Sequence, residues 1–254
     1  MSRFVSGSEP FLFPSGRTGC ILLHGFTAMP EETRQLGKYL AENGLTALGV
    51  RLSGHASHPN DLRHTCWTDW LLDVETAAAL LSDLTERIFI IGQSMGGILS
   101  LIFSTEYSVA GVVTVATPAL PVSPKVPFGY FFQKVFFPTI FMDKVKGKPA
   151  RANPRQPNYP AYAYYPSRIH TEVHKLQNHL SKTLQKVTSP ALIIQSRDDP
   201  WVPSSSAEYI YDKIQSQQKS IFWMEKSGHS VLLSEDRLLA FTSILNFIQE
   251  NVPA

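Results

Sequence analysis

A serine in a tight turn is the first candidate for chemistry in this sequence. Residues 92–96 have the sequence Gly-Gln-Ser-Met-Gly and fit the Gly-x-Ser-x-Gly pattern. An apolar run, residues 88–91, precedes the pattern, and a segment of helical character, residues 97–104, follows it. A strand that turns sharply into a helix lifts the middle residue out of the fold in a strained conformation. The sequence therefore predicts a nucleophilic hydroxyl at Ser94, with two glycines that let strand and helix approach closely.

A serine hydroxyl is a weak nucleophile near neutral pH, so it needs a base and a carboxylate that orients the base. His229 follows an apolar strand-like run that ends at residue 224. Asp198 and Asp199 directly follow another such run, residues 191–195. Both carboxylates are candidates for the orienting acid. The one that does not serve as the acid is expected to be solvated or to cap a turn.

The same chemistry requires backbone N–H groups that stabilise a developing oxyanion. One should be the amide of Met95, the residue after the nucleophile, at a helix N-terminus where the dipole favours negative charge. The other should come from a loop after an early strand. Residues 24–27, His-Gly-Phe-Thr, form such a loop. We expect His24 to shape this loop rather than to carry protons.

Strand-like and helical segments alternate along most of the chain, which indicates β-α-β units and a mainly parallel sheet. Strands are predicted at residues 20–23, 45–50, 87–91, 109–115, 191–195 and 220–224. Helices are predicted at residues 30–43, 67–84, 167–186, 205–214 and 238–251. The core contacts expected from the last helix are Leu239, Ile244, Leu245 and Ile248.

The segment 118–188 differs from the rest of the chain. It contains 10 of the 18 prolines and 11 aromatic residues, and 11 of its residues are Lys or Arg while 2 are acidic. So many prolines argue against a sheet strand or a long straight helix in its first half. Its charge indicates a separate structural layer.

Composition limits the alternatives. A chain of 254 residues with 43% hydrophobic residues is long enough for one substantial core. The two cysteines, Cys20 and Cys66, have neither disulfide-framework nor zinc-site spacing, which favours a reducing compartment. Neither a signal-like N-terminus nor a run of about 18 apolar residues occurs. We therefore predict a cytoplasmic location, and the lack of a glycine-rich nucleotide motif predicts no nucleotide cofactor.

Two groups of histidines could suggest a metal, and neither fits a metal-site pattern. Residues 55–64 contain three histidines and Asp61 without a recognised ligand spacing. In residues 170–174 the glutamate comes one position too late for His-Glu-x-x-His. We predict that no metal binds, and that residues 170–174 form a solvated helix face.

These motifs together resemble the α/β-hydrolase superfamily, and within it the bacterial carboxylesterases related to monoacylglycerol lipases. The resemblance extends over nearly the whole chain. The matching stretches are residues 23–27, 54–55, 67–70, 92–97 and 199–203. The family often has glycine where this chain has Ser196 and Ala56.

The resemblance implies an α/β-hydrolase fold, an α/β architecture with a mainly parallel central sheet flanked by helices. Residues 1–117 and 189–254 would form its core, and residues 118–188 a cap, or lid, over the site. Phe and Tyr side chains of the cap would line an acyl pocket, while its basic residues face solvent or an anionic lipid surface. Alternatively, the aromatic residues pack the cap onto the core.

The resemblance also assigns the site. It implies a catalytic triad of Ser94, Asp199 and His229, since the spacing from the acid to Val202 favours Asp199 over its neighbour, and it makes the Phe26 amide the second oxyanion donor. The implied activity is carboxylic ester hydrolysis through an acyl-enzyme, on a small ester or a monoacylglycerol, and nucleic acid is not expected as a partner. Thioesterases, acyltransferases and carbon–carbon hydrolases use the same strand–turn–helix around the nucleophile, which is called the nucleophile elbow. The alternative that is not an enzyme is a noncatalytic ligand-binding protein of this fold.

Overall fold

The computed structural model describes residues 7–121, 141–143, 160–162 and 164–252. The strands are β1 (Phe11–Phe13), β2 (Thr18–Leu23), β3 (Thr46–Val50), β4 (Arg87–Gln93), β5 (Gly111–Val115), β6 (Phe141–Asp143), β7 (Tyr164–Pro166), β8 (Ala191–Ser196) and β9 (Lys219–Met224). The α-helices are α1 (Glu31–Glu42), α2 (Trp67–Ser82), α3 (Met95–Glu106), α5 (Ile169–Thr183), α6 (Ser205–Lys213) and α7 (Arg237–Glu250). Short 3-10 helices are η1 (Pro59–His64), η2 (Leu184–Lys186) and η3 (Val231–Leu233).

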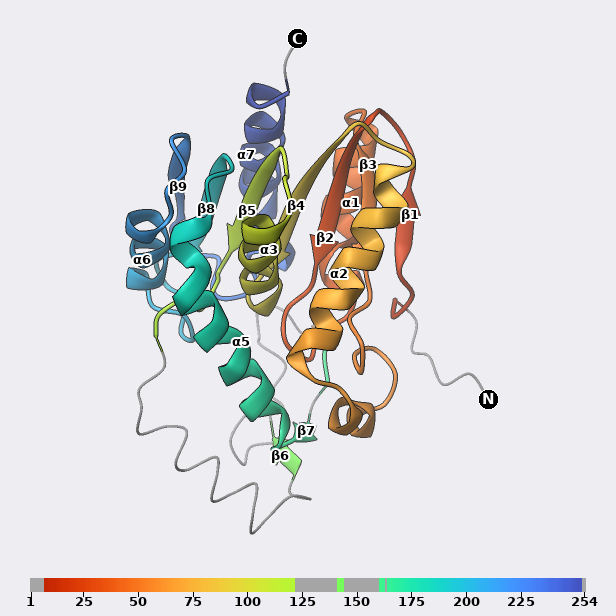
Figure 1. Cartoon of the computed structure of the whole chain (residues 1–254), viewed down its shortest axis with the longest axis vertical. Coiled ribbons are helices and arrows are strands. Elements are labelled where there is room, and N and C mark those ends of the chain that lie inside the picture. Colours follow the sequence, from red (N-terminus) through yellow and green to blue (C-terminus); the bar gives the residue numbers. More distant parts are fainter. Residues whose placement is uncertain (1–6, 122–140, 144–159, 163, 253–254) are drawn as a thin grey trace.

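Seven of these strands form one twisted sheet in the order β1-β3-β2-β4-β5-β8-β9 (Figure 1). The β1 strand at the edge runs antiparallel to β3, and every other neighbouring pair is parallel. The mainly parallel sheet predicted from the sequence is thus confirmed. Because parallel strands end at the same edge, the loops after β2, β4, β5, β8 and β9 lie along that edge.

Helices cover both faces of the sheet, and each face has its own apolar cluster. On one face, apolar residues of α2, α3, α5 and α6 pack on strand residues such as Ile21 and Leu23. On the other face, α1 and α7 pack on Cys20 and Leu22. Neighbouring residues of β2 alternate between the two clusters, as the two-residue period of a strand requires. Both faces of the central strands are therefore buried, which explains their continuous apolar runs.

Each predicted helix and strand is present, with ends that differ by a few residues. The three-residue strands β1, β6 and β7 were not predicted, because segments this short show no detectable alternation. The helix predicted at residues 167–186 is α5 followed by η2. Its buried residues Leu176 and Leu180 belong to the same cluster as the sheet residues. The division of the chain into a core and a cap over residues 118–188 stays a prediction.

The predicted core contact at Leu239 is wrong. Its exposed fraction is 58%, whereas Ile244, Leu245 and Ile248 are buried as predicted. Ala240 and Phe241 already face the core at this level of α7, so the helical rotation turns Leu239 aside.

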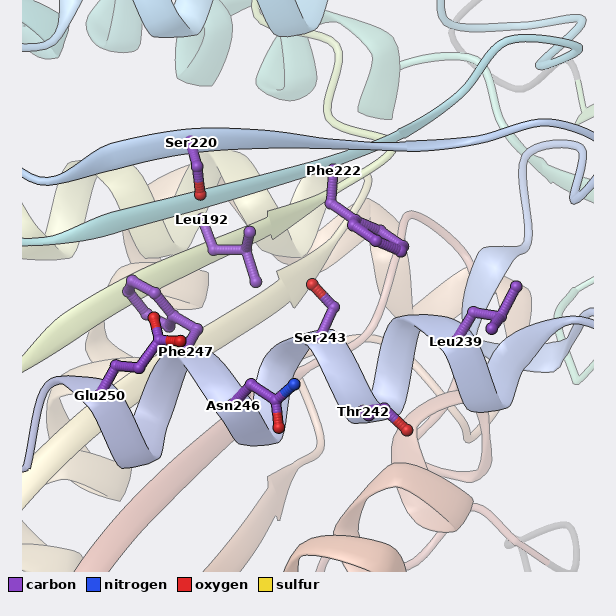
Figure 2. Close-up of a pocket in the computed structure, with 9 residues that line it drawn as sticks. All are labelled: Leu192, Ser220, Phe222, Leu239, Thr242, Ser243, Asn246, Phe247 and Glu250. Carbon is purple, nitrogen blue, oxygen red and sulfur yellow. The ribbon is translucent and has the colours of Figure 1, made fainter.

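Leu239 instead lines an open pocket of about 450 Å³ between α7 and the strands β8 and β9 (Figure 2). Other lining residues come from the same side of α7 (Thr242, Ser243 and Asn246) and from β9 (Phe222). None of the candidate catalytic residues lines this pocket. In the described part of the chain, no helix is long and apolar enough to span a membrane.

Burial on α7 can be tested with two substitutions. Ile244→Ala removes a fully buried side chain from the core and should lower the free energy of unfolding by roughly 2 to 5 kcal/mol. Leu239→Ala, five residues earlier on the same helix, should change it by about 0.5 kcal/mol or less. Urea unfolding followed by circular dichroism measures both. Equal losses in the two variants would contradict the orientation of α7.

Candidate active site

Ser94 lies in the sharp turn between β4 and α3, at the edge where the parallel strands end. Its φ of 54° and ψ of −117° put a non-glycine residue in a strained conformation. The Ser94 N–H donates to the Val115 carbonyl over 2.7 Å, which ties the turn to β5. A β-carbon at Gly92 would overlap the backbone of Gly96, and one at Gly96 would overlap the carbonyl oxygen of Leu23. Only glycine therefore fits at these two positions.

Backbone strain is concentrated along this edge. Among the described residues, four residues other than glycine have positive φ, and they are Thr27, Ala56, Ser94 and Ala116. Each lies in the loop that follows one of the strands β2, β3, β4 and β5. Such conformations cost about 1 to 3 kcal/mol each and persist only where the surrounding structure imposes them. The strain thus coincides with the place where the candidate site residues meet.

The structure brings Ser94, His229 and Asp199 into one hydrogen-bonded chain. His229 Nε2 lies 3.1 Å from Ser94 Oγ, and His229 Nδ1 lies 2.9 Å from Asp199 Oδ2. The Asp199 side chain has no exposed surface. An ionised carboxylate can only accept hydrogen bonds, so Nδ1 must donate. Nε2 is then the acceptor nitrogen of the ring, and it faces the serine hydroxyl.

Backbone amides hold the second oxygen of Asp199. Its Oδ1 accepts from the Trp201 N–H over 2.8 Å and from the Val202 N–H over 3.0 Å. These two donors fix the plane of the carboxylate. The spacing between Asp199 and Val202 was the feature of the resemblance that favoured Asp199 as the acid. In the structure these residues form the turn that orients its carboxylate.

Asp198 was the other candidate for the orienting acid, and it has a different set of partners. Its Oδ1 accepts from the Gly228 N–H over 2.8 Å and from Ser196 Oγ over 2.7 Å. Ser196 Oγ in turn accepts from the Ser227 N–H over 3.1 Å. Asp198 and Ser196 therefore attach the end of β8 to the loop that precedes His229.

Two residues place the peptide that contains the Phe26 amide. The Gly25 carbonyl accepts from the Ala28 N–H over 3.1 Å and lies 2.9 Å from His24 Nδ1. In a trans peptide the N–H points opposite to the carbonyl, so these bonds also set the direction of the Phe26 N–H. Met95 is the first residue of α3, and an N–H at that position has no partner within the helix.

The buried His24 helps to hold this loop. Its Nδ1 donates to Gly25, and its Nε2 accepts from the Leu52 N–H over 3.3 Å. Burial lowers the pKa of His24 to about 4, so the ring is neutral near pH 7. A neutral ring with both nitrogens bonded to backbone agrees with the loop-shaping role expected from the sequence.

The predicted solvated face at residues 170–174 is wrong. Glu172 is buried and accepts a hydrogen bond from Lys175 over 2.9 Å. The ring of His170 packs against Tyr165, with centroids 5.2 Å apart, and burial is the main cause that lowers its pKa to about 4. The periodicity of α5 does not reveal this, because part of the cover is distant in sequence: the ring of Phe26 lies 6.3 Å from that of His170, and the Trp67 N–H donates to Glu172 over 3.4 Å.

Two further contacts at the site escaped the sequence analysis. Trp201 is 57% exposed, and its ring stacks on His229 with a centroid distance of 5.5 Å and an interplanar angle of 16°. The only signal in the sequence was its place two residues after Asp199. The ring of Phe26 packs edge-on against Tyr165 at 5.0 Å. Within the described residues, no cluster of three or more His, Cys, Asp or Glu side chains could hold a metal ion.

Known proteins are similar to this chain in sequence over nearly its whole length. Residues 15–236 match the hydrolase family described as serine aminopeptidase, S33. A carboxylesterase of Bacillus subtilis (strain 168) is 29% identical over 245 residues, which cover 95% of this chain and 96% of that protein. A thermostable monoacylglycerol lipase of Bacillus sp. (strain H-257) is 29% identical over 249 residues, 97% of this chain and 96% of that protein.

Solved structures extend the comparison to the fold. A structure from work on LipS and LipT, two metagenome-derived lipolytic enzymes, has a TM-score of 0.86 at 29% identity and covers 97% of this chain and 99% of its own. The monoacylglycerol lipase of Paleococcus ferrophilus has a TM-score of 0.80 at 14% identity, with 96% and 99% covered. The chain therefore belongs to the serine aminopeptidase (S33) hydrolase family, and its fold is the α/β-hydrolase fold.

Proposed function

We propose that this protein hydrolyses carboxylic esters through an acyl-enzyme formed on Ser94. The observation that carries the proposal is the continuous hydrogen-bonded chain from Ser94 through His229 to the buried Asp199. The family match and the two bacterial relatives, a carboxylesterase and a monoacylglycerol lipase, support the same chemistry.

In the first half-reaction, Ser94 Oγ attacks the carbonyl carbon of the ester while its proton passes to His229 Nε2. The carbonyl oxygen becomes an oxyanion, which the amides of Phe26 and Met95 stabilise. Collapse of this intermediate breaks the bond to the alcohol, and the alcohol leaves with the proton from His229. The charged imidazole that exists between these steps is stabilised by Asp199, its buried hydrogen-bond partner.

Water completes the cycle. His229 Nε2 removes a proton from the water molecule, whose oxygen attacks the acyl carbon and forms a second oxyanion. His229 then returns the proton to Ser94 Oγ as the acid is released. Neither half-reaction consumes a cofactor.

The substrate side of the site involves residues from the segment 118–188. The Tyr162 N–H donates to the Thr27 carbonyl over 2.9 Å, and Ala161 forms a β-bridge with Ala28. The end of this segment thus lies on the loop that contains Phe26. A cap placed here supports an acyl pocket above Ser94, and small esters or monoacylglycerols are the proposed substrates.

Other parts of the substrate hypothesis stay predictions. The aromatic residues expected to line the acyl pocket are concentrated at residues 128–141, most of which lie outside the described part of the chain. Contact with an anionic lipid surface also depends on that region. A cytoplasmic location also stays a prediction, which rests on the cysteine count.

The nucleophile is tested by Ser94→Ala. Turnover of p-nitrophenyl butyrate should fall by about 10⁶-fold, the scale seen when a triad nucleophile is removed. Ser104→Ala, which alters a buried hydroxyl on α3 bonded to the Leu101 carbonyl, is the matched control and should stay active. An organophosphonate should label the wild type stoichiometrically at Ser94. Retention of most activity in Ser94→Ala would refute the mechanism, and absence of labelling would favour a noncatalytic binding protein.

The two neighbouring carboxylates give a second test. Asp199→Asn should lower kcat by about 10⁴-fold, because an amide at this position favours the wrong histidine tautomer. Asp198→Asn should cost much less, since its oxygen bonds the loop backbone rather than His229. Steady-state kinetics on both variants decides between them. If Asp198→Asn had the larger effect, the assignment of the acid would be wrong.

A substrate panel separates the enzyme classes that share this elbow. Oxygen esters and monoacylglycerols of increasing chain length should be hydrolysed, with kcat/KM well above that for matched thioesters. An excess of primary alcohol should not divert the acyl group, as it would in an acyltransferase. Preferential thioester cleavage or efficient acyl transfer would replace the ester-hydrolase proposal by that alternative.

A further inference from the structure

A buried carboxylate lies beside the candidate site and takes no part in the mechanism above. Glu32, the second residue of α1, has no exposed surface. Its Oε2 accepts from the Gly25 N–H over 2.6 Å, and its Oε1 accepts from Gln93 Nε2 over 2.6 Å. Burying a carboxylate is costly unless such donors compensate for the lost water. Two short bonds, one to the loop after β2 and one to the last residue of β4, indicate a specific role for this group.

Gln93 extends the contact to a third loop. It is the residue before Ser94 and is also fully buried. Its Oε1 accepts from the Leu232 N–H over 3.1 Å, in the helix η3 that follows His229. The carboxylate of Glu32 can only accept and the Leu232 amide can only donate, so the Gln93 amide fits in one orientation. We call this chain of contacts, from Gly25 through Glu32 and Gln93 to Leu232, the polar bridge.

The polar bridge acts on the peptide groups around Gly25. Glu32 fixes the Gly25 N–H, and Ala28 and His24 fix the Gly25 carbonyl, so both peptide planes that meet at this residue are held. The Phe26 N–H belongs to the second of these planes. A β-carbon at Gly25 would lie 3.3 Å from Ser94 Cβ, which shows how closely this loop approaches the nucleophile. A small rotation at Gly25 would therefore move the Phe26 N–H relative to Ser94.

We propose that Glu32 is a positioning residue, which acts through the polar bridge. It holds three parts of the site in one alignment: the oxyanion loop (residues 24–27), the nucleophile elbow (residues 92–96) and the histidine loop (residues 227–232). The proposal rests on the ester-hydrolase function proposed above. Glu32 acts through Gly25 and Gln93 and contacts no reacting atom. Catalytic groups must be held to within about 0.5 Å of their productive geometry. Loss of the Glu32 carboxylate should therefore weaken stabilisation of the transition state more than it weakens substrate binding.

The test is Glu32→Gln, which keeps the shape of the side chain. Glutamine has one acceptor oxygen, so its amide group must face either Gly25 N–H or Gln93 Nε2 with donor against donor. We expect kcat for p-nitrophenyl butyrate to fall by roughly 10- to 100-fold, below the full loss of an oxyanion donor. KM should change by less than about threefold, because a transition-state interaction lowers kcat and kcat/KM together. A trifluoromethyl ketone, which forms a tetrahedral adduct with serine, should bind more weakly by the same factor as kcat/KM falls.

Glu31→Gln is the matched control. Glu31 precedes Glu32 in the first turn of α1, but its carboxylate pairs with Arg34 at 2.7 Å on the more exposed side of the helix. The control makes the same chemical change and removes an ion pair without touching the polar bridge. Its kcat and KM should equal those of the wild type. All variants are assayed well below their melting temperatures, measured by circular dichroism.

If Glu32→Gln does not fold, Gln93→Met breaks the polar bridge at its next residue. The positioning role then again predicts a lower kcat with a nearly unchanged KM. In the double variant the losses in kcat should be less than multiplicative, because both changes break one network. Unchanged kcat in a folded variant, a loss shared by Glu31→Gln, or a change in KM alone would overturn the positioning role. If the wild type neither cleaves esters nor reacts with the phosphonate at Ser94, the proposed function fails instead.

Discussion

The backbones of β4, α3 and the end of β2 meet in one contact so close that no side chain fits at Gly92, which faces Gly96, or at Gly96, which faces the Leu23 carbonyl. This contact forces the chain into a sharp turn and leaves Ser94 at a φ of 54°, with its side chain beyond the end of the strand. It also places the N-terminus of α3, with the Met95 amide, beside the serine. Strain of this kind persists only where packing on several sides imposes it. The apolar clusters on both faces of the sheet, which include β4 and α3, provide that packing.

Around this turn, the polar groups form two separate networks with different tasks. In one, the buried Asp199 receives two backbone N–H groups and bonds His229, which in turn bonds Ser94. In the other, the buried Glu32 holds the oxyanion loop and, through Gln93, the loop after His229. The first network would transfer protons during the reaction, whereas the second would only hold the loops in place. Both meet the requirement that a buried carboxylate be fully hydrogen-bonded.

The described end of the segment 118–188, Tyr162 and α5, contacts both the loops beside Ser94 and the core. Tyr162 donates to the oxyanion loop and bonds the Gly54 carbonyl through its hydroxyl, while α5 packs on α3. Leu176 and Leu180 lie in the same apolar cluster as the sheet residues. The described end of this segment is therefore fixed to the rest of the protein.

Much of the fold could be predicted because it depends on local patterns. Apolar period and glycine positions predict strands and helices, and the Gly-x-Ser-x-Gly pattern predicts the nucleophile, whereas the choice of Asp199 as the acid came from the family resemblance. The ends of elements, the edge strand β1 and the exposure of Leu239 were missed, because they depend on which neighbour covers a residue rather than on the residue itself.

The residues alone left Asp198 and Asp199 as equivalent candidates, and nothing in the sequence indicated the polar bridge. These features join residues that are far apart in the chain: 61 positions separate Glu32 from Gln93, and 139 separate Gln93 from Leu232. The sequence by itself determined the residue types, their order and the main strands and helices. Only the tertiary structure decided which buried donor meets which acceptor, because a hydrogen bond requires a partner within about 3 Å in the right direction, and periodicity contains no such information.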